Sequence, residues 1–536
     1  MFPRGLSWLA NQLVGSFSAH WSSKFGQQSP YRKIGAPGSW HCSKESCIPT
    51  DSAVWDHVFE SDESWRLRTI KVDHMLSTLV GSAADNGDGT CPGPRGWPHP
   101  GHECKPGERT ALIRNHSEAV LACLTSPSVA QAFLSALAHS AARHGVTIEW
   151  CMSYPNVLME SLATGNASTH ARGSDDSHPV GAGTVDGHIG YTFNNWHGFA
   201  GESTFIWALG LWPFKDTYEP TRTHARAHAG HSLMPIDVLM CVCMCVPAGR
   251  STCLPATNLL SFYSNSSVTP LNKFAEDYLG HEPRPFTHAL VAALGGGGVA
   301  NGDPVGSTDA TLLMLTCTAT GQLLKPTMPA MYIDRTWLRD APVGETALAV
   351  STIGGLSWRM IYSINSAGFE LTASDVGITE PALVYAYCGP RPLTRAGCDQ
   401  PGVRGLQRLG AGVKLRVPAA AHDLEAQYHV VSPVIQSAGV SGPSWSLLGE
   451  WPKLVPVSEQ RFVSIETTAE ALEVTLVGDE DERVDLIAAI RSPSSSPRAT
   501  SWRVAALTCH FGPSGARHVA RWSATGEATC GEEVVR

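Results

Sequence analysis

Short apolar runs alternate with helix-like stretches through the first two-thirds of this chain, and the apolar runs end at or near polar residues. Residues 67–72 form a strand-like run that ends at Asp73, and residues 118–144 carry apolar side chains at helical spacings. Further strand-like runs occupy residues 146–152, 205–211 and 289–299, with a short helical pattern at 156–162. Such alternation predicts parallel strands joined by helices, and polar residues just past the strand ends are typical of the active face of a (β/α)8 barrel.

The pattern changes after about Ala347. Short strand-like runs separated by Gly, Ser and Pro follow at residues 347–351, 358–363, 382–387, 427–431 and 472–476. Short strands at this spacing predict an antiparallel β-sandwich. We therefore expect an α/β barrel domain over residues 1–340 and an antiparallel β domain over residues 345–536.

Composition excludes several classes of protein. A chain of 536 residues is too long for one ordinary core, which agrees with two domains. The net charge of -9 and the lack of a basic stretch argue against a nucleic-acid partner. No run of 18 apolar residues occurs, so no membrane span is expected. The first ten residues do not read as a secretory signal, which favours the cytoplasm.

The 15 cysteines show no spacing typical of a disulfide framework. Cys151 and Cys317 lie inside apolar runs, where we expect buried thiols. No Cys-x-x-Cys pair occurs, so we expect no structural zinc site, and nothing in the sequence calls for a cofactor. The redox compartment stays open.

Two short motifs each place a carboxylate two or three residues after a basic residue. The first is Ile70-Lys71-Val72-Asp73, and the second is Arg172-Gly173-Ser174-Asp175-Asp176. Each follows a strand-like run, so parallel strands would bring both carboxylates to one edge of a sheet. Two carboxylates in one pocket, one acting as nucleophile and one carrying a proton, are what a glycosidase with a covalent glycosyl intermediate needs.

These motifs belong to a longer ordered series. Lys71-Val72-Asp73 is followed by Cys151-Met152, and then by Arg172, Ser174, Asp175, Asp176 and Pro179. Further along come Gly297-Gly298-Val299 with Asp303 and Gly306, and then Gly321, Leu324-Lys325, Pro329 and Asp334. Over roughly residues 40–390 the chain resembles the glycoside hydrolase clan of α-galactosidases and raffinose synthases, specifically the raffinose synthase and seed-imbibition-protein branch.

The resemblance implies a retaining glycoside hydrolase or transglycosidase that acts on α-galactosyl-type bonds of an oligosaccharide or glycoside. Asp73 would be the nucleophile and Asp175 the acid/base, with its proton retained through the nearby charge of Asp176. Lys71 and Arg172 would bind sugar hydroxyls. The remaining candidates for the sugar pocket are Cys151, Trp150 or Trp196 as a stacking platform, Asp216 and Asp303.

The chain also departs from the family pattern. Ser177-His178 stands where the family has Phe-Tyr, and Gly298 stands where it has proline. The resemblance begins late: Leu6 to Trp21 matches the third barrel strand, so the first two strands and their sugar-binding aspartates have no counterpart. We therefore expect an incomplete barrel and cannot separate an enzyme from a catalytically inactive, carbohydrate-binding relative or fragment by sequence alone.

Two segments have the texture of insertions, a Gly/Pro-rich run at 92–108 and a Cys/His-rich run at 219–262. The second carries His224, His228 and His231, which raises a metal-dependent hydrolase as a third possibility. That possibility is the weakest, because no His-Glu-x-x-His pattern follows a strand or lies on a helix. We expect both segments to pack poorly against the barrel.

Overall fold

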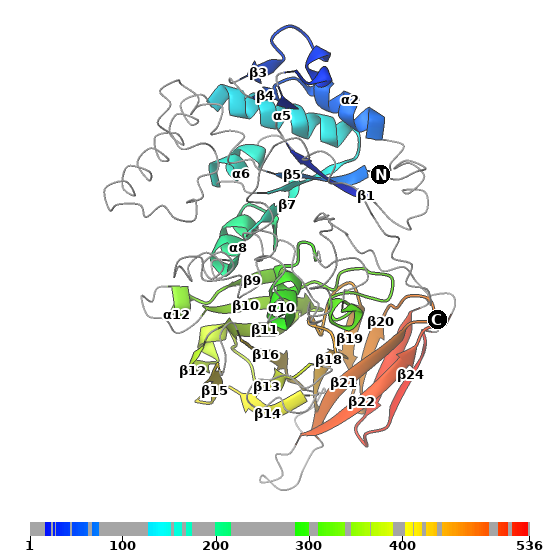
Figure 1. Cartoon of the computed structure of the whole chain (residues 1–536). Coiled ribbons are helices and arrows are strands. Elements are labelled where there is room, and N and C mark those ends of the chain that lie inside the picture. Colours follow the sequence, from blue (N-terminus) through cyan, green and yellow to red (C-terminus); the bar gives the residue numbers. More distant parts are fainter. Residues whose placement is uncertain are drawn as a thin grey trace, which may run out of the picture.

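The structure is a computed structural model, and it describes residues 17–22, 25–26, 28–42, 46–62, 67–73, 127–151, 155–162, 168–173, 199–215, 285–299, 309–337, 345–364, 366–389, 403–410, 412–420, 425–436, 442–491, 502–512 and 517–533. An α/β part with a parallel sheet is followed by a larger antiparallel β part (Figure 1). This order agrees with the expected succession of the two kinds of structure.

Five parallel strands form the sheet of the α/β part. They are β1 (Phe17–Ser22), β5 (Leu67–Asp73), β6 (Thr147–Trp150), β7 (Ser168–Arg172) and β8 (Trp212–Phe214). Their order in the sheet is β1-β5-β6-β7-β8, the same as their order in the chain. Each strand is thus added beside the previous one, as in a singly wound barrel, and the order does not reverse as in a doubly wound sheet. Among the described residues β1 and β8 pair on one side only, so these strands do not close into a barrel.

Helices cover one face of this sheet. They include α2 (Ser52–Asp62) and α5 (Pro127–Arg143), which lie side by side above the strands in Figure 1, and α6 (Pro155–Leu162) between β6 and β7. Trp55 of α2 and Phe133 of α5 are fully buried against Ile70 and Ile148 of the strands. The two helices are also joined by Arg143, whose guanidinium contacts the Asp56 carboxylate at 2.5 Å. No helix in the described part of the chain is both long and apolar enough to cross a bilayer.

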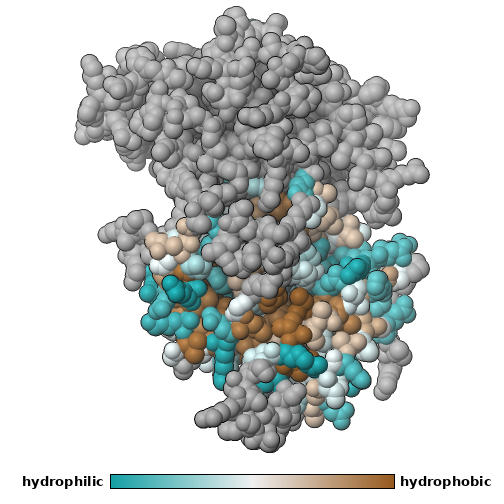
Figure 2. All heavy atoms as spheres, turned by 60° about the horizontal axis from the view of Figure 1, so that its bottom comes forward, coloured by the Kyte–Doolittle hydropathy of each residue, from teal (hydrophilic) through white to brown (hydrophobic). Residues whose placement is uncertain are grey.

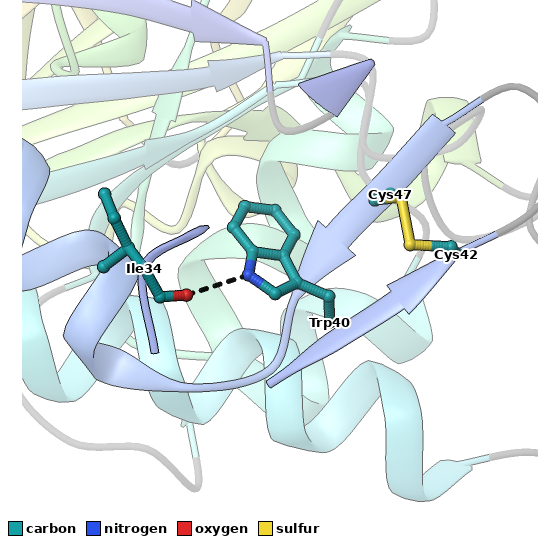
Figure 3. Close-up of a disulfide and its surroundings, with 4 residues drawn as sticks. All are labelled: Ile34, Trp40, Cys42 and Cys47. Atoms are coloured by element: carbon teal, nitrogen blue, oxygen red, sulfur yellow. Dashed lines mark hydrogen bonds between the residues drawn. A yellow bond between two sulfur atoms is a disulfide. The ribbon is translucent and has the colours of Figure 1, made fainter. Parts of the chain in front are cut away.

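A small subdomain separates β1 from α2. It holds β2 (Phe25–Gly26), the 3-10 helix η1 (Pro30–Lys33), β3 (Trp40–Cys42) and β4 (Ser46–Pro49). Figure 3 shows the Cys42–Cys47 disulfide joining β3 to β4, and the Trp40 indole donating to the Ile34 carbonyl at 3.0 Å. Phe25 packs edge-on against Trp40, with ring centroids 5.1 Å apart. This contact extends the helix-covered core outward.

Two of the strand predictions are wrong. Residues 205–211 contain the end of helix α8 (Phe199–Ala208), and the strand β8 begins only at Trp212. Residues 289–299 contain most of helix α10 (Pro285–Gly295), in which every residue is buried. Both runs are apolar all round, and a short apolar run of this kind cannot be assigned to a strand or a buried helix by periodicity.

The antiparallel part begins with a six-stranded sheet. Its strands are β9 (Met328–Tyr332), β10 (Glu345–Ile353), β11 (Leu356–Ile364), β13 (Ala382–Tyr387), β14 (Val403–Leu409) and β16 (Ala426–Pro433), in the order β14-β13-β16-β11-β10-β9. Helix α10 packs on one face of this sheet, and the pair β12 (Ala367–Thr372) and β15 (Lys414–Ala419) packs on the other. The short helices are α11 (Ala310–Leu313), α12 (Asp334–Trp337) and η5 (Ser374–Val376).

Two four-stranded antiparallel sheets form what we call the C-terminal sandwich. One sheet contains β17 (Ile435–Gln436), β18 (Ser444–Trp451), β21 (Arg483–Arg491) and β22 (Arg503–His510); the other contains β19 (Phe462–Thr467), β20 (Ala471–Leu476), β23 (His518–Ser523) and β24 (Ala528–Glu532). Trp445, Leu486 and Trp522 are buried between them. Every strand expected after residue 347 is present in the antiparallel part. In Figure 2, hydrophobic residues gather at the centre of the coloured antiparallel surface, between hydrophilic flanks.

The cysteine expectation needs correction. Besides Cys42–Cys47, a disulfide joins Cys509 of β22 to Cys530 of β24, and Cys388 is disulfide-bonded as well. These pairings depend on which strands become neighbours, which spacing along the chain does not reveal. Cys151 and Cys317 are buried thiols, as expected.

Candidate active site on the parallel sheet

The two faces of the parallel sheet differ in chemistry. Ile70, Val72, Ile148, Trp150 and Ala171 point into the core beneath α2 and α5. The alternating residues point the other way, because successive side chains of a strand lie on opposite faces. This second face, called the polar face below, carries Thr69, Lys71, Thr147, Glu149, Cys151, His170, Trp212 and Phe214. The hydroxyls of Thr69 and Thr147, 2.9 Å apart on β5 and β6, agree with this assignment.

The polar face is organised in rows that run across the strands. The backbone register pairs Lys71 with Glu149, Glu149 with His170, and His170 with Trp212, so one row of titratable residues ends at a tryptophan. The next row, two residues nearer the carboxyl edge, follows Asp73, Cys151, Arg172 and Phe214. Because Asp73 ends β5 and Arg172 ends β7, this second row lies at the edge where parallel-sheet enzymes bind ligands.

Lys71 is a buried cation on this face, with 4% of its surface exposed. Its ammonium nitrogen lies 5.5 Å from the centre of the Phe214 ring, within the range of a cation–π contact. A buried lysine keeps its charge only if nearby groups compensate for lost hydration. The aromatic face of Phe214 is one such group, and it comes from the far strand of the sheet.

His170 and Lys325 bring two more nitrogen groups together. Burial and, to a smaller extent, the positive charge of Lys325 together lower the pKa of His170 from 6.5 to about 4. The Lys325 ammonium lies 4.1 Å from the centre of the Trp212 ring. Burial also lowers the pKa of Lys325, and the charge of Glu459 opposes that effect. The imidazole is therefore neutral at pH 7.

A glycine run lies along the outer edge of β8. After α10 the chain passes Trp212 at Gly296, Pro213 at Gly297 and Phe214 at Gly298. A Cβ atom at Gly297 would lie 2.5 Å from the Pro213 carbonyl oxygen, so only glycine allows this approach. Gly297-Gly298-Val299, one of the segments on which the family resemblance rests, thus runs beside the last described parallel strand.

The structure describes the expected site residues unevenly. Lys71 and Cys151 are buried on the polar face, whereas only the backbone of Asp73 and Arg172 is described. Trp150 is fully buried in the core on the helix-covered face, so its indole has no free surface for stacking, and we leave it out of the site. The following lie outside the described residues: Asp175, Asp176, Trp196, Asp216, Asp303 and both insert-like segments, 92–108 and 219–262.

Two residues of the polar face, Glu149 and His170, were not identified from the sequence, and Lys325 was named only as part of the motif series, without a place in the site. Glu149 and His170 could have been found by alternation, since each lies two positions before a residue that was singled out, Cys151 and Arg172. Lys325 could not, because its approach to Trp212 depends on how a distant segment folds back. No cluster of three or more metal-ligating side chains occurs among the residues that the structure describes.

No family is identified by comparison of the sequence with known proteins. The chain matches no protein-family profile, and no curated protein shows significant similarity to it. Among solved structures, it is similar to a GH27 β-L-arabinopyranosidase from Geobacillus stearothermophilus, with a TM-score of 0.42 and 12% identity over 81% of this chain and 78% of that one. A variant of that enzyme in complex with arabinose gives a TM-score of 0.40 and 11% identity, over 81% of this chain and 79% of that one.

Proposed function

We propose that this chain is a retaining α-glycosidase or transglycosidase in which Asp73 attacks the anomeric carbon and Asp175 transfers the proton. In the first step Asp73 forms a bond to the sugar while Asp175 gives its proton to the departing glycosidic oxygen. In the second step Asp175 takes a proton from water or from an acceptor sugar. The oxygen of that molecule bonds to the anomeric carbon and displaces Asp73. An oligosaccharide or glycoside with an α-galactosyl-type bond is the proposed substrate.

One observation carries this proposal. The first three motif segments of the family resemblance lie on the adjacent strands β5, β6 and β7. The register pairs Val72 with Trp150 and Trp150 with Ala171, and continuing it by one residue would bring Asp73, Cys151 and Arg172 into one row at the carboxyl edge. Asp175 follows Arg172 by three residues, close enough for a short turn to bring its carboxyl back to this edge. Parallel strands in chain order also support the proposed barrel-type domain, but the expected boundary at residues 340–345 lies after β9, which already pairs with β10 in the antiparallel sheet.

Lys71 lies two residues before Asp73 on the same strand, and so on the same face. A positive charge at that distance favours the ionised carboxylate, which is the form that attacks. Arg172 is proposed to bind sugar hydroxyls, with Asp176, Asp216 and Asp303 as further polar contacts.

The test is hydrolysis of aryl α-galactosides and of raffinose-type oligosaccharides by the wild type and two variants. Asp73→Asn should abolish turnover of both substrates, because the amide cannot form the glycosyl ester. Asp175→Asn should reduce turnover of the oligosaccharide far more than that of the aryl glycoside, whose leaving group needs no proton. Added azide should restore aryl glycoside turnover in Asp175→Asn alone.

Asp481→Asn, in an exposed turn with a positive φ of 56° that asparagine accepts, is the matched control and should leave turnover unchanged. If the wild type binds oligosaccharide without turnover, the catalytic proposal is wrong and a carbohydrate-binding relative is the better description. If both substrates lose activity equally in Asp175→Asn, with no azide rescue, Asp175 does not transfer the proton.

A further inference from the structure

Residues 314–325, which we call the bridging segment, are fastened to the C-terminal sandwich. The Lys453 ammonium donates to the carbonyls of Met314 and Cys317 at 2.8 Å and 2.6 Å. The backbone N–H of Ala319 donates to the Glu482 carboxylate at 3.0 Å, and that of Thr320 donates to Asp479 at 2.7 Å. These partners lie 136 to 163 residues apart in the chain, yet side chains of the sandwich hold the backbone of the segment directly.

The last residue of the bridging segment, Lys325, is held through both its backbone N–H and its backbone carbonyl. Its carbonyl accepts a hydrogen bond from the Ser458 hydroxyl at 2.9 Å, and its N–H donates to the Gln460 side chain at 3.3 Å. The Ser458 hydroxyl also lies 2.5 Å from the Gln460 amide oxygen, so its one proton is shared between that oxygen and the Lys325 carbonyl. The direction in which the Lys325 side chain leaves the backbone is thus set by the sandwich.

A buried ion cluster stands behind this clamp. Arg461, 1% exposed, donates to Glu450 at 2.9 Å and to Glu482 at 2.7 Å. Glu482 also accepts from the N–H of Asp479 at 2.8 Å. The same carboxylate that holds the bridging segment is therefore anchored by a buried guanidinium, which has no freedom to move without leaving charges unpaired.

The other end of Lys325 reaches the polar face of the parallel sheet. Its ammonium lies over the Trp212 ring, and the Cζ3 atom of that ring packs against Gly296, where a Cβ atom would come within 2.6 Å. Trp212 is the register partner of His170, in the row directly below the row of Asp73 and Arg172. Lys325 is thus a cation supplied to the parallel sheet by a segment that the sandwich holds.

We propose that the C-terminal sandwich is part of the working site, because through the bridging segment it holds Lys325 over Trp212 as a positioning residue beneath the substrate. This inference rests on the proposed glycosidase function. Lys325 acts through Trp212 and the His170 row, which form the floor on which the sugar would lie, and it need not touch the substrate itself.

The experiment compares four variants with the wild type on an aryl α-galactoside. Lys325→Met keeps the side-chain stem and removes the charge, and we expect kcat/KM to fall by about tenfold to a hundredfold, the range for a misplaced site. Lys325→Arg should restore most of that loss. Lys414→Met, which removes an exposed lysine paired with Glu370, is the control and should change nothing.

Gln460→Ala, the fourth variant, should lower kcat/KM in the wild-type background and have almost no further effect in the Lys325→Met background. That non-additivity distinguishes an effect that passes through Lys325 from a general loss of stability, which would add in both backgrounds. Additive losses, or a Lys325→Met variant indistinguishable from Lys414→Met, would overturn the inference.

A second readout needs no enzymatic activity. The titration of His170, followed by NMR and assigned by its absence in His170→Gln, should move upward from about 4 in Lys325→Met, because a nearby positive charge is lost. Glu149 and Lys71 share the row and remain in every variant. An inactive wild type with this upward shift would refute the glycosidase proposal but not the placement of Lys325. An unchanged titration would refute the placement itself.

Discussion

The Lys71 ammonium nitrogen lies 5.5 Å from the centre of the Phe214 ring, although β5 and β8 are separated by two intervening strands. Three strand spacings amount to about 14 Å in a flat sheet, and side chains stand roughly perpendicular to a sheet. The two side chains can meet only if the sheet curves around its polar face. That curvature is the one a barrel needs, and it makes the polar face the concave side.

The contact between Lys71 and Phe214 should appear as a coupling energy. In a double-mutant cycle of Lys71→Met and Phe214→Leu, measured by chemical denaturation, we expect a coupling of about 0.5–2 kcal/mol. The pair Lys71→Met and Phe462→Leu serves as control, since Phe462 lies in the C-terminal sandwich, and should be additive. A coupling near zero for the first pair would mean that the sheet is flatter than described here.

His170 should make the protein less stable in mild acid. Its pKa is about 4 in the folded state against 6.5 for the unperturbed group, so between these values the unfolded chain binds more protons at this residue. The free energy of unfolding should therefore fall as pH is lowered from 6.5 to 4, by up to about 3 kcal/mol. His170→Gln should flatten that part of the pH profile, and an unchanged profile would contradict the lowered pKa.

The two acids of the buried ion cluster should differ in importance. Glu482→Gln removes the charge that faces Arg461 and replaces one of the two oxygens that accept from Arg461, Ala319 and Asp479 by an NH2 donor, and should cost about 3–5 kcal/mol of unfolding free energy. Glu450→Gln should cost clearly less, because burial raises the pKa of Glu450 and so already disfavours its charge. Calorimetric unfolding of the two variants would check this order, and the reverse order would contradict it.

The Cys509–Cys530 disulfide should stabilise the C-terminal sandwich. It closes a separation of 21 residues, for which loop entropy gives about 3 kcal/mol. The double variant Cys509→Ala/Cys530→Ala should lose about that much, and the wild type should lose it in reducing buffer. Cys42→Ala/Cys47→Ala is the comparison, with a separation of 5 and a smaller expected loss. Equal stability with and without reductant would mean that the bond does not form.

The sequence predicted the residues at which strands end better than it predicted whether an apolar segment is a strand or a helix. Strand β5 ends at Asp73 and β7 at Arg172; in β5 the β-branched residues Thr69, Ile70 and Val72 before the aspartate are a local signal of the strand. Helix α10 was mistaken for a strand, since all of its residues are buried and no polar stripe marks the helical period. Strand β8 is only three residues long and lies at the end of an apolar run that belongs to α8.

The candidate site was predictable to the extent that it is local. Lys71 and Cys151 could be identified because each belongs to a motif at a strand end. Lys325 could not, since its position depends on Ser458 and Gln460, more than a hundred residues further along the chain, and on the burial of Arg461. Interactions of that sequence separation leave no periodic pattern in either partner.

The hydrogen bonds of the bridging segment also determine when during protein synthesis this segment can reach its final position. The backbone N–H of Ala319 cannot form its hydrogen bond until Glu482, 163 residues later in the chain, has been synthesised. At the usual rate of synthesis of about 5–20 residues per second, that interval is roughly 8–30 s. The parallel strands can assemble in the order in which they emerge, but Lys325 cannot take its place until the sandwich is made. A nascent or prematurely terminated chain that stops before Glu482 would then carry Asp73 and Arg172 without Lys325 held over Trp212.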